Sequence, residues 1–431
     1  MDHHREAASS VDVLPRAWAP TEPRRTMSRT PPRDIADSAA RNTGGLLPPI
    51  TAGVVSALVG FTSSFVVVLS GLTAVGANHE QAASGLLAVS VVMGLACIVL
   101  SWQTRLPITA AWSTPGAALL ATTGTVDGGW PAAVGAFLVT GVLIVLTGLV
   151  PQLAALVTRI PTSLAQAMLA GVLLQLCLGP VTGLAVNPIA VAPVVLTWLV
   201  ALRFSPRWAA PLAFLAAAVV IGIAVAAGET TVGPADLVPR VHLTSPTFTV
   251  AGVVGIALPL YLVTMASQNV PGVAVMAGLG YQVPWRRSMV VTGAGTLLGA
   301  TAGGHAINLA AISAALAAGP DAGVDRTRRW IASLTAGIVL MLLGVASASF
   351  GTLVALAPVG VIAAVAGLAL LGTLAASLTA AFADPVERIP VVITFVTAAS
   401  GTVIVGVSAA FWALVAGLAA RLLLGKPRSA A

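Results

Sequence analysis

From Gly44 to the C-terminus, the chain consists of long apolar runs that are separated by short polar breaks. A helix that crosses the roughly 30 Å hydrocarbon core of a bilayer needs about 20 mostly apolar residues, and many of these runs are that long. The segments of about ten alternating apolar and polar residues that are typical of a membrane β-barrel do not occur. The pattern therefore predicts an all-α polytopic membrane protein. Its 14 transmembrane spans are expected at 47–76, 84–103, 107–123, 130–151, 161–181, 187–203, 208–227, 247–276, 286–303, 305–319, 329–348, 352–381, 389–407 and 409–424.

Charged residues support this count, because they fall in the breaks between the spans. The odd-numbered breaks hold four acidic residues and one basic residue, namely Glu80, Asp127, Glu229, Asp236 and Arg240. The even-numbered breaks and the C-terminal end hold 13 basic residues, namely Arg105, Arg159, Arg203, Arg207, Arg286, Arg287, Arg326, Arg328, Arg329, Arg388, Arg421, Lys426 and Arg428. Because basic loops stay on the cytoplasmic side, both termini are expected to be cytoplasmic in a bacterial inner membrane.

Composition adds four expectations to this picture. Residues 1–43 are rich in Arg, Ser, Pro, Asp and Glu and are expected to form a disordered cytoplasmic tail. Over the whole chain, 57% of the residues are hydrophobic and 8% are charged, which excludes an ordinary soluble domain. The net charge of +7 comes from basic residues spread over many loops, so no nucleic-acid partner is expected. Cys97 and Cys177 lie in apolar runs, where buried thiols are expected and a disulfide or a metal site is not.

The second half of the chain resembles the first at an offset of about 200 residues. "ITAAWSTPGAAL" from Ile108 aligns with "INLAAISAAL" from Ile307, and "AMLAGVLL" from Ala167 aligns with "AVAGLALL" from Ala364. Seven spans in each copy would place the second copy inverted in the bilayer. The expected domains are a first seven-span repeat at 44–228, an external connecting loop at 229–246 and an inverted second repeat at 247–431. A chance match between stretches rich in Ala, Gly and Leu is the alternative.

The third and tenth spans are short, and each begins with residues that do not favour a helix. Residues 106–112 are expected to be extended, after which 113–115 form a helix start with a hydroxyl N-cap and a proline in the first turn. The glycines 303–304 precede a second extended piece at 305–308, and helix is expected from Ala310 onward. Broken spans of this kind line cavities in carriers, and their helix starts suit a carboxylate. The alternative is two ordinary short, tilted helices.

Polar residues lie inside the long first and eighth spans, at 62–64 and 267–269. Ser and Thr there can simply hydrogen-bond to their own helix. The adjacent carboxamides of Gln268 and Asn269 need partners that lipid does not offer, which a ligand carboxylate or the opposite broken span would supply. No Asp, Glu, Lys or Arg lies at mid-span, so His305 is the candidate proton carrier, because imidazole titrates near neutral pH. The alternative is a loop histidine near a break.

Four strings together carry a family resemblance: "PPITAGVVSALVGFTSSFVVVLSGLTAVGA" from Pro48, "LPITAAWSTPGAALLA" from Leu106, "ALPLYLVTMASQNVPGVAVMAGLGY" from Ala257 and "GGHAINLAAISAAL" from Gly303. From about residue 45 to its end, the chain resembles the benzoate/proton symporter (BenE) family. The resemblance implies a 14-span fold of two inverted seven-span repeats, with a core domain of spans 1–4 and 8–11 and a gate domain of spans 5–7 and 12–14. The substrate would lie between the broken third and tenth spans and move as the core shifts against the gate.

More distantly, "GGHAIN" and "LVTMASQN" resemble segments of uracil-permease-like carriers, in which acidic side chains hold a nucleobase. In this chain His305 and Gln268 occupy those positions. The loss of both acids fits an anionic substrate, which a pair of carboxylates would repel.

The family resemblance implies proton-coupled uptake of benzoate or a similar aromatic carboxylate, with no cofactor besides the proton and no metal. Trp112 is expected to stack on the aromatic ring, and His305 to carry the proton. The full set of expected substrate-binding residues is Trp112, Ser113, Thr114, Gln268, Asn269, His305, Asn308, Ala310, Thr62 and Ser64. The expected partners are the substrate and the lipid bilayer, and carriers of this kind often form a homodimer through the gate domain.

Three other functions are open to a chain of this kind. A nucleobase or inorganic-anion carrier of the same fold is the nearest, and a passive channel is the second. A membrane-embedded enzyme is disfavoured, because there is no H-E-x-x-H motif and no pair of acidic residues at depth. No catalytic residue is therefore expected.

Overall fold

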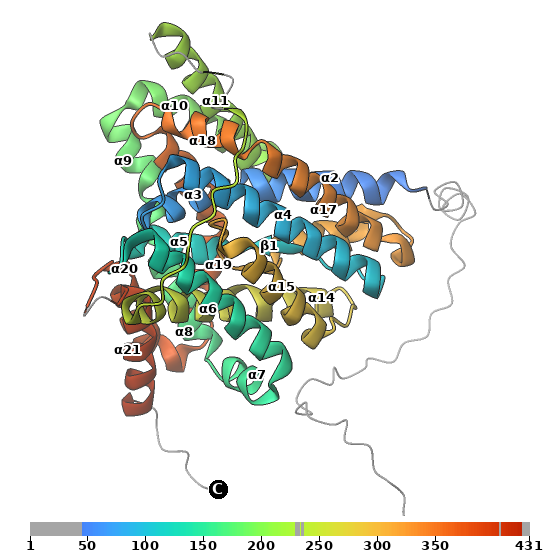
Figure 1. Cartoon of the computed structure of the whole chain (residues 1–431), viewed down its shortest axis with the longest axis vertical. Coiled ribbons are helices and arrows are strands. Elements are labelled where there is room, and N and C mark those ends of the chain that lie inside the picture. Colours follow the sequence, from blue (N-terminus) through green and yellow to red (C-terminus); the bar gives the residue numbers. More distant parts are fainter. Residues whose placement is uncertain (1–44, 229–232, 234–236, 405–406, 425–431) are drawn as a thin grey trace, which may run out of the picture. The chain divides into compact units, whose positions relative to one another are not determined.

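The structure is a computed structural model that describes residues 45–228, 233, 237–404 and 407–424. Helices form most of this part of the chain (Figure 1). Among the described residues, eight helical segments are long and apolar enough to cross a membrane, and two shorter apolar helices accompany them. The predicted class, an all-α polytopic membrane protein, is confirmed, whereas the count of 14 spans stays a prediction. The tail predicted at 1–43 lies outside the described residues.

The elements of the first half are α2 (Leu47–Thr62), α3 (Phe65–Ala74), α4 (His79–Thr104), β1 (Ala110–Trp112), α5 (Thr114–Thr123), α6 (Gly129–Leu149), α7 (Pro151–Thr158), α8 (Thr162–Cys177), α9 (Gly179–Val186), α10 (Pro188–Phe204) and α11 (Ala209–Ala227). Those of the second half are α12 (Val250–Gly252), α13 (Leu258–Thr264), α14 (Val270–Gly278), α15 (Trp285–Ala300), β2 (Ile307–Leu309), α16 (Ile312–Ala318), α17 (Trp330–Val345), α18 (Ser347–Ala355), α19 (Val361–Ala381), α20 (Arg388–Ala399) and α21 (Ala409–Leu424). Two π-helical turns, Val253–Ala257 and Met265–Asn269, join α12, α13 and α14 into one helical segment.

The start of α4 differs from the prediction, because the helix begins at His79 and not at residue 84. The Asn78 side chain accepts a hydrogen bond from the Gln81 N–H (2.8 Å), and the Gln81 side chain accepts one from the Asn78 N–H (3.0 Å). This capping box satisfies two N–H groups that the first turn would otherwise leave free. The predicted break before residue 84 is correspondingly shorter.

Two predicted boundaries in the second half are also wrong. Residues 349–351 belong to α18 and not to a break, and the turn comes at 356–360, where Gly360 has a φ of +87°. The helix predicted up to residue 407 ends at Ala399, and Gly401 follows with a φ of +63°. A glycine with positive φ commonly ends or begins a helix, because other residues rarely adopt that conformation.

A two-stranded antiparallel sheet joins β1 to β2, with Ala111 opposite Asn308. Beyond the strands, the Ala310 N–H donates to the Thr109 carbonyl at 2.9 Å and so continues the ladder. Extended backbone is therefore present inside a largely apolar helical protein. The two segments that form it lie far apart in the sequence and run in opposite directions.

Side chains of neighbouring helical segments satisfy the outward-facing N–H groups of this sheet. Three such hydrogen bonds are present: Ala110 N–H to Cys97 Sγ (3.1 Å), Ile307 N–H to Thr296 Oγ1 (3.1 Å) and Leu309 N–H to Asn269 Oδ1 (2.9 Å). All three acceptor residues are fully buried. Lipid offers no partner to an open sheet edge, so these acceptors are what permits a sheet at this position.

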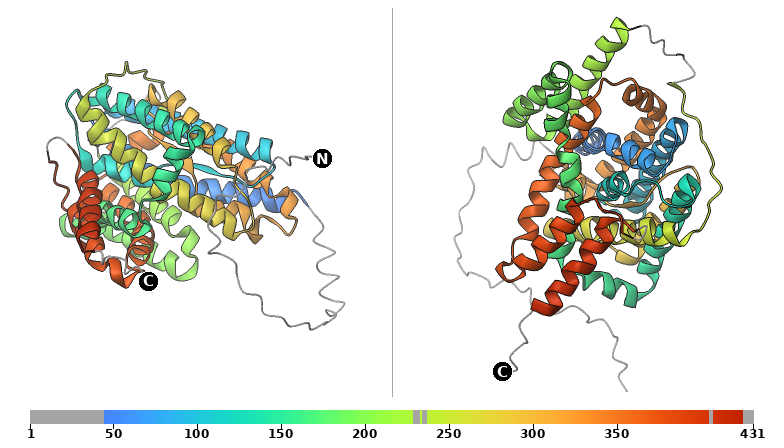
Figure 2. Two further views of the ribbon diagram at one scale, coloured as in Figure 1. Left: turned by 90° about the horizontal axis from the view of Figure 1, so that it is seen from below. Right: turned by 90° about the vertical axis from the view of Figure 1, so that its left-hand side faces the viewer.

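Close helix contacts depend on glycine. At the crossing of α4 and α17, a Cβ on Gly94 would lie 2.6 Å from the Gly337 carbonyl oxygen, and a Cβ on Gly337 would lie 2.5 Å from the Gly94 oxygen. The two helices approach each other through this pair of small residues, as membrane helices commonly do. Elsewhere, α8 packs against both α19 and α20, and α20 lies beside α21 (Figure 2).

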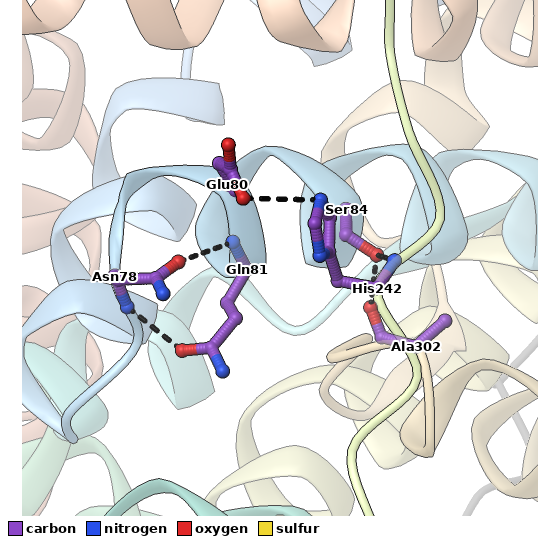
Figure 3. A network of polar contacts seen from close by, with 6 residues as sticks. All are labelled: Asn78, Glu80, Gln81, Ser84, His242 and Ala302. Atoms are coloured by element: carbon purple, nitrogen blue, oxygen red, sulfur yellow. Dashed lines mark hydrogen bonds and ion pairs between the residues drawn. The ribbon is translucent and has the colours of Figure 1, made fainter.

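Residues 238–249 form a strap without helix or strand between α11 and α12, and this strap includes the second half of the external loop predicted at 229–246 (Figure 1). The His242 N–H donates to the Ser84 hydroxyl at 2.9 Å, and this hydroxyl donates to the Ala302 carbonyl at 2.8 Å (Figure 3). The His242 ring nitrogen Nε2 also lies 3.4 Å from a Glu80 carboxylate oxygen. The strap is thereby fixed to the start of α4 and to the segment after α15.

Candidate functional site

Each of the two broken segments changes from a strand to a helix, as predicted. The side chain of Ser113 caps α5 by accepting a hydrogen bond from the Gly116 N–H at 3.1 Å, and a proline lies in the first turn. The second helix, α16, begins at Ile312, so the prediction of helix from Ala310 is wrong by two residues. The reason is that the Ala310 N–H takes part in the sheet ladder and is not at a helix start.

The same hydrogen bonds decide which amides at the start of α5 can meet an anion. The Ser113 N–H donates to the Ala306 carbonyl (2.9 Å), the Ala117 N–H donates to the Ser113 carbonyl (2.7 Å), and the Gly116 N–H is held by the cap. Proline has no N–H group. Within the described residues, the Thr114 N–H is therefore the first-turn amide without a protein partner. The N–H groups of Ser113 and Ala310, two of the expected substrate-binding residues, both bond to the backbone of the opposite broken segment.

Ser64 lies at the break between α2 and α3 and brings two predicted residues together. Its hydroxyl oxygen accepts hydrogen bonds from the Trp112 indole N–H (2.9 Å) and from the Thr114 hydroxyl (3.2 Å). Trp112 is buried against Phe61, with ring centroids 5.1 Å apart. Thr62 stays outside this group, because its hydroxyl donates to the Leu58 carbonyl of its own helix at 2.7 Å.

The π-helical turn before α14 presents the two predicted carboxamides differently. Asn269 is fully buried; its oxygen accepts the Leu309 N–H and its nitrogen lies 3.1 Å from Met265 Sδ. Its partner is thus the opposite broken segment, one of the two partners expected for it. Gln268 is half-buried, and its side chain has no hydrogen bond within the described residues. Single π-helical turns occur often at functional sites in helices.

His305 and Asn308 are both fully buried beside the sheet. Neither ring nitrogen of His305 has a hydrogen-bond partner within the described residues. His305 lies next to Ala306, whose carbonyl accepts the Ser113 N–H at 2.9 Å, so its backbone is near the start of α5. With its amide nitrogen toward the Leu309 carbonyl (2.9 Å), Asn308 directs its oxygen toward the Ser113 N–H (3.3 Å).

Several residues beside the site have no counterpart among the predicted ones. The Thr264 hydroxyl donates a hydrogen bond to Ser113 Oγ at 2.8 Å and so links α13 to the start of α5. Trp112 touches a cluster of rings through Phe61, whose ring centroid lies 5.6 Å from that of Phe65 and 5.2 Å from that of Phe350. The spacing of Phe61 and Phe65, four residues apart across the break in the first span, is the one sequence signal for this cluster.

The sequence is similar to known proteins over most of its length. The family model described as "Benzoate membrane transport protein" (BenE) matches residues 46–423. The chain is 38% identical to the inner membrane protein YdcO of Escherichia coli over 373 residues, which cover 86% of this chain and 94% of the relative. It is 31% identical to the benzoate membrane transport protein of Acinetobacter baylyi over 386 residues, which cover 88% of this chain and 95% of the relative.

Among solved structures, the fold is similar to that of two anion carriers. The transmembrane domain of the cyanobacterial bicarbonate transporter BicA matches with a TM-score of 0.56 at 16% identity, over 86% of this chain and 97% of that one. The murine anion transporter Slc26a9 in its inward-facing state matches with a TM-score of 0.59 at 14% identity, over 94% of this chain and 73% of that one. At these identities the likeness concerns the fold.

Proposed function

The chain belongs to the BenE family of benzoate membrane transport proteins and is a membrane transporter, not an enzyme, and from this premise we propose that it takes up benzoate or a similar aromatic carboxylate together with a proton. We place it in the bacterial inner membrane, with both termini cytoplasmic and no cofactor besides the proton. The observation that carries the proposal is the meeting of two strand–helix segments beside a buried, unpartnered histidine.

The proposed architecture has 14 spans in two inverted repeats, with the core and gate domains expected from the family. Two observations support it. The strand–helix segments that align in sequence pair antiparallel, which suits inverted copies. The second pair of aligned strings lies on α8 and α19, and these helices pack against each other. In this proposal the substrate moves when the core shifts against the gate, and a homodimer would form through the gate.

The substrate carboxylate would bind at the start of α5. The Thr114 N–H and the positive end of the helix dipole offer an anion site there, and the free carboxamide of Gln268 would add a hydrogen bond. The Ser64 hydroxyl already donates to the Gly60 carbonyl at 3.3 Å, so in this proposal it holds Trp112 and Thr114 in place. Asn269 serves in this proposal as a positioning residue, because its oxygen already holds the Leu309 N–H. The aromatic ring of the substrate would pack against Phe61 and its neighbouring rings, which supports an aromatic acid over a small inorganic anion.

His305 is the proposed proton carrier. A buried imidazole without hydrogen-bond partners is costly, so such residues in membrane proteins usually have a function. Its neighbour Ala306 accepts the Ser113 N–H, which brings the histidine near the start of α5, where the carboxylate would bind. The entering carboxylate would favour the protonated ring, because opposite charges stabilise each other in a medium of low polarity. The neutralised pair could then cross with the moving core.

The experiment is uptake of radiolabelled benzoate by proteoliposomes with an imposed pH gradient, for the wild type and for His305→Gln. The variant should lose accumulation driven by the gradient but keep exchange of labelled for unlabelled benzoate, because exchange needs no net proton movement. His79→Gln is the matched control, since His79 is exposed at the start of α4. Gradient-driven accumulation by His305→Gln at the wild-type level would eliminate the proton role.

A second candidate function is transport of an inorganic anion or a nucleobase. The two structural neighbours named above, a bicarbonate transporter and an anion transporter, favour the first of these. Competition of benzoate uptake by unlabelled benzoate, bicarbonate, sulfate and uracil separates the candidates. Inhibition by benzoate alone supports the aromatic acid, whereas stronger inhibition by bicarbonate, sulfate or uracil supports the alternative.

A further inference from the structure

An open basin of about 810 Å³ lies where the C-terminal ends of α4 and α6 meet the N-terminal end of α15. Its polar lining consists of Gln103, Thr104, Gln282, Arg286 and Arg287. Leu106, Leu149, Pro284 and Val290 complete it. The size is in the range of small-molecule sites. The basin is separate from the proposed transport site at the sheet.

The two arginines of the basin carry unneutralised charge. Neither Arg286 nor Arg287 has an ion pair or a side-chain hydrogen bond within the described residues. Among the described residues, the acidic residues expected on the same side of the membrane bond elsewhere: Asp321 to Arg207, Asp325 to Arg328, Glu387 to Arg421, and Asp384 to the Val386 N–H. The 16-residue helix α15 also begins here without a side-chain cap, which adds the positive end of its dipole. The basin is therefore a concentrated positive site.

An exposed apolar stripe on α6 leads to this site. Val142, Leu146 and Leu149 are 45%, 38% and 46% exposed, respectively. Their spacing of four and three residues places them on one face of the helix. The last of them, Leu149, also lines the basin. A positive site thus lies at the end of a strip of surface that is suited to hydrocarbon.

We propose that the basin binds the phosphate headgroup of an anionic phospholipid, with an acyl chain along the α6 stripe. The basic residues of this region are expected on the cytoplasmic side, where anionic lipid headgroups attract clustered arginines. Arginine suits phosphate because its guanidinium can donate two parallel hydrogen bonds. Free inorganic phosphate could bind to the arginines, but it has no acyl chain to pack on the apolar stripe. The stripe therefore favours a phospholipid over free phosphate as the ligand.

The experiment uses the full-length protein, purified in a neutral detergent, with phosphatidylglycerol and phosphatidylcholine as the probe lipids. Native mass spectrometry should show phosphatidylglycerol bound in preference to phosphatidylcholine. Arg286→Gln/Arg287→Gln should weaken phosphatidylglycerol binding by roughly 30-fold, because each basic residue near an anionic headgroup contributes about fivefold. Arg286→Lys/Arg287→Lys keeps the charge but loses the paired hydrogen bonds, so its phosphatidylglycerol binding should lie between that of the wild type and that of the Gln variant.

The matched control is Arg203→Gln/Arg388→Gln, which removes the same charge from α10 and α20. This variant should bind phosphatidylglycerol like the wild type. Leu146→Ser tests the stripe and should weaken lipid binding without changing any effect of inorganic phosphate. Equal losses in the control and basin variants would overturn the proposal, as would full displacement of the lipid by millimolar phosphate.

Discussion

Thr296→Val is expected to lower the free energy of unfolding by about 1–3 kcal/mol. The Thr296 hydroxyl accepts the Ile307 N–H of β2 at 3.1 Å and donates to the Thr292 carbonyl of its own helix at 2.9 Å. Valine has nearly the same shape as threonine but no acceptor. The substitution would leave a buried sheet-edge N–H without a partner, and the cost is the desolvation penalty of that group.

A matched control lies one turn earlier on α15. Thr292 is also fully buried, but its hydroxyl bonds only to the Ser288 and Met289 carbonyls of its own helix, at 2.9 and 3.4 Å. Thr292→Val therefore leaves no N–H without a partner, and its cost should stay below about 0.5 kcal/mol. The difference between the two variants isolates the sheet-edge hydrogen bond.

The assay for this pair is reversible unfolding in mixed micelles of a mild detergent and dodecyl sulfate, followed by tryptophan fluorescence. The free energies can be compared if a second probe, such as circular dichroism, gives the same transition. Benzoate uptake should fall only in Thr296→Val, because only that change loosens the strand beside the proposed site. Equal destabilisation by the two variants would show that the sheet edge is not what Thr296 stabilises.

Two further substitutions test the site and the helix contacts. Ser64→Ala removes the acceptor of the Trp112 indole N–H and should lower kcat/KM for benzoate uptake by about tenfold, which corresponds to one lost buried hydrogen bond. Gly94→Ala brings a methyl group within 2.6 Å of the Gly337 carbonyl oxygen and should destabilise the protein by about 1–3 kcal/mol in the same unfolding assay.

Each of these has a control on a similar element. Ser70→Ala removes a hydroxyl that bonds only to the Val66 carbonyl of its own helix, so uptake should not change. Gly222→Ala places a methyl group where no atom lies within 4 Å, and the helix should become more stable by up to about 1 kcal/mol. Uptake by Ser64→Ala equal to that of Ser70→Ala, or stability of Gly94→Ala equal to the wild type, would contradict the reasoning.

Local signals in the sequence predict where the backbone stops being helical. The hydroxyl cap and the proline after residue 112 fix the start of α5, and the glycines 303–304 precede β2. The start of α16 is missed because it depends on a distant residue: Ala310 bonds to Thr109, which lies about 200 positions earlier. The capping box of α4 is local, and the pair Asn78 and Gln81 could have revealed it.

The roles of the predicted polar residues depend on contacts that no local pattern contains. The sequence marks Ser64 and Trp112 separately, and their direct hydrogen bond emerges only in the fold. From the sequence, the Asn269 side chain could bind either a ligand or the opposite broken segment. In the structure its oxygen accepts the Leu309 N–H of that segment. The ring cluster around Phe61 draws on helices that are far apart in the chain, so its assembly cannot be inferred from periodicity.

The hydrogen bonds at the sheet edges also indicate how the carrier would move. Because the edge acceptors are Cys97 on α4, Asn269 before α14 and Thr296 on α15, any displacement of the sheet must carry these three segments with it. The contact between Phe65 and Phe214 of α11 is different, since two rings at 4.8 Å form no hydrogen bond. Apolar contacts lack direction and can be exchanged at little cost, whereas buried hydrogen bonds cannot. The proposed boundary between core and gate therefore fits best at the contact between Phe65 of α3 and Phe214 of α11. The sheet and the three segments that carry its acceptors would move together as one rigid unit.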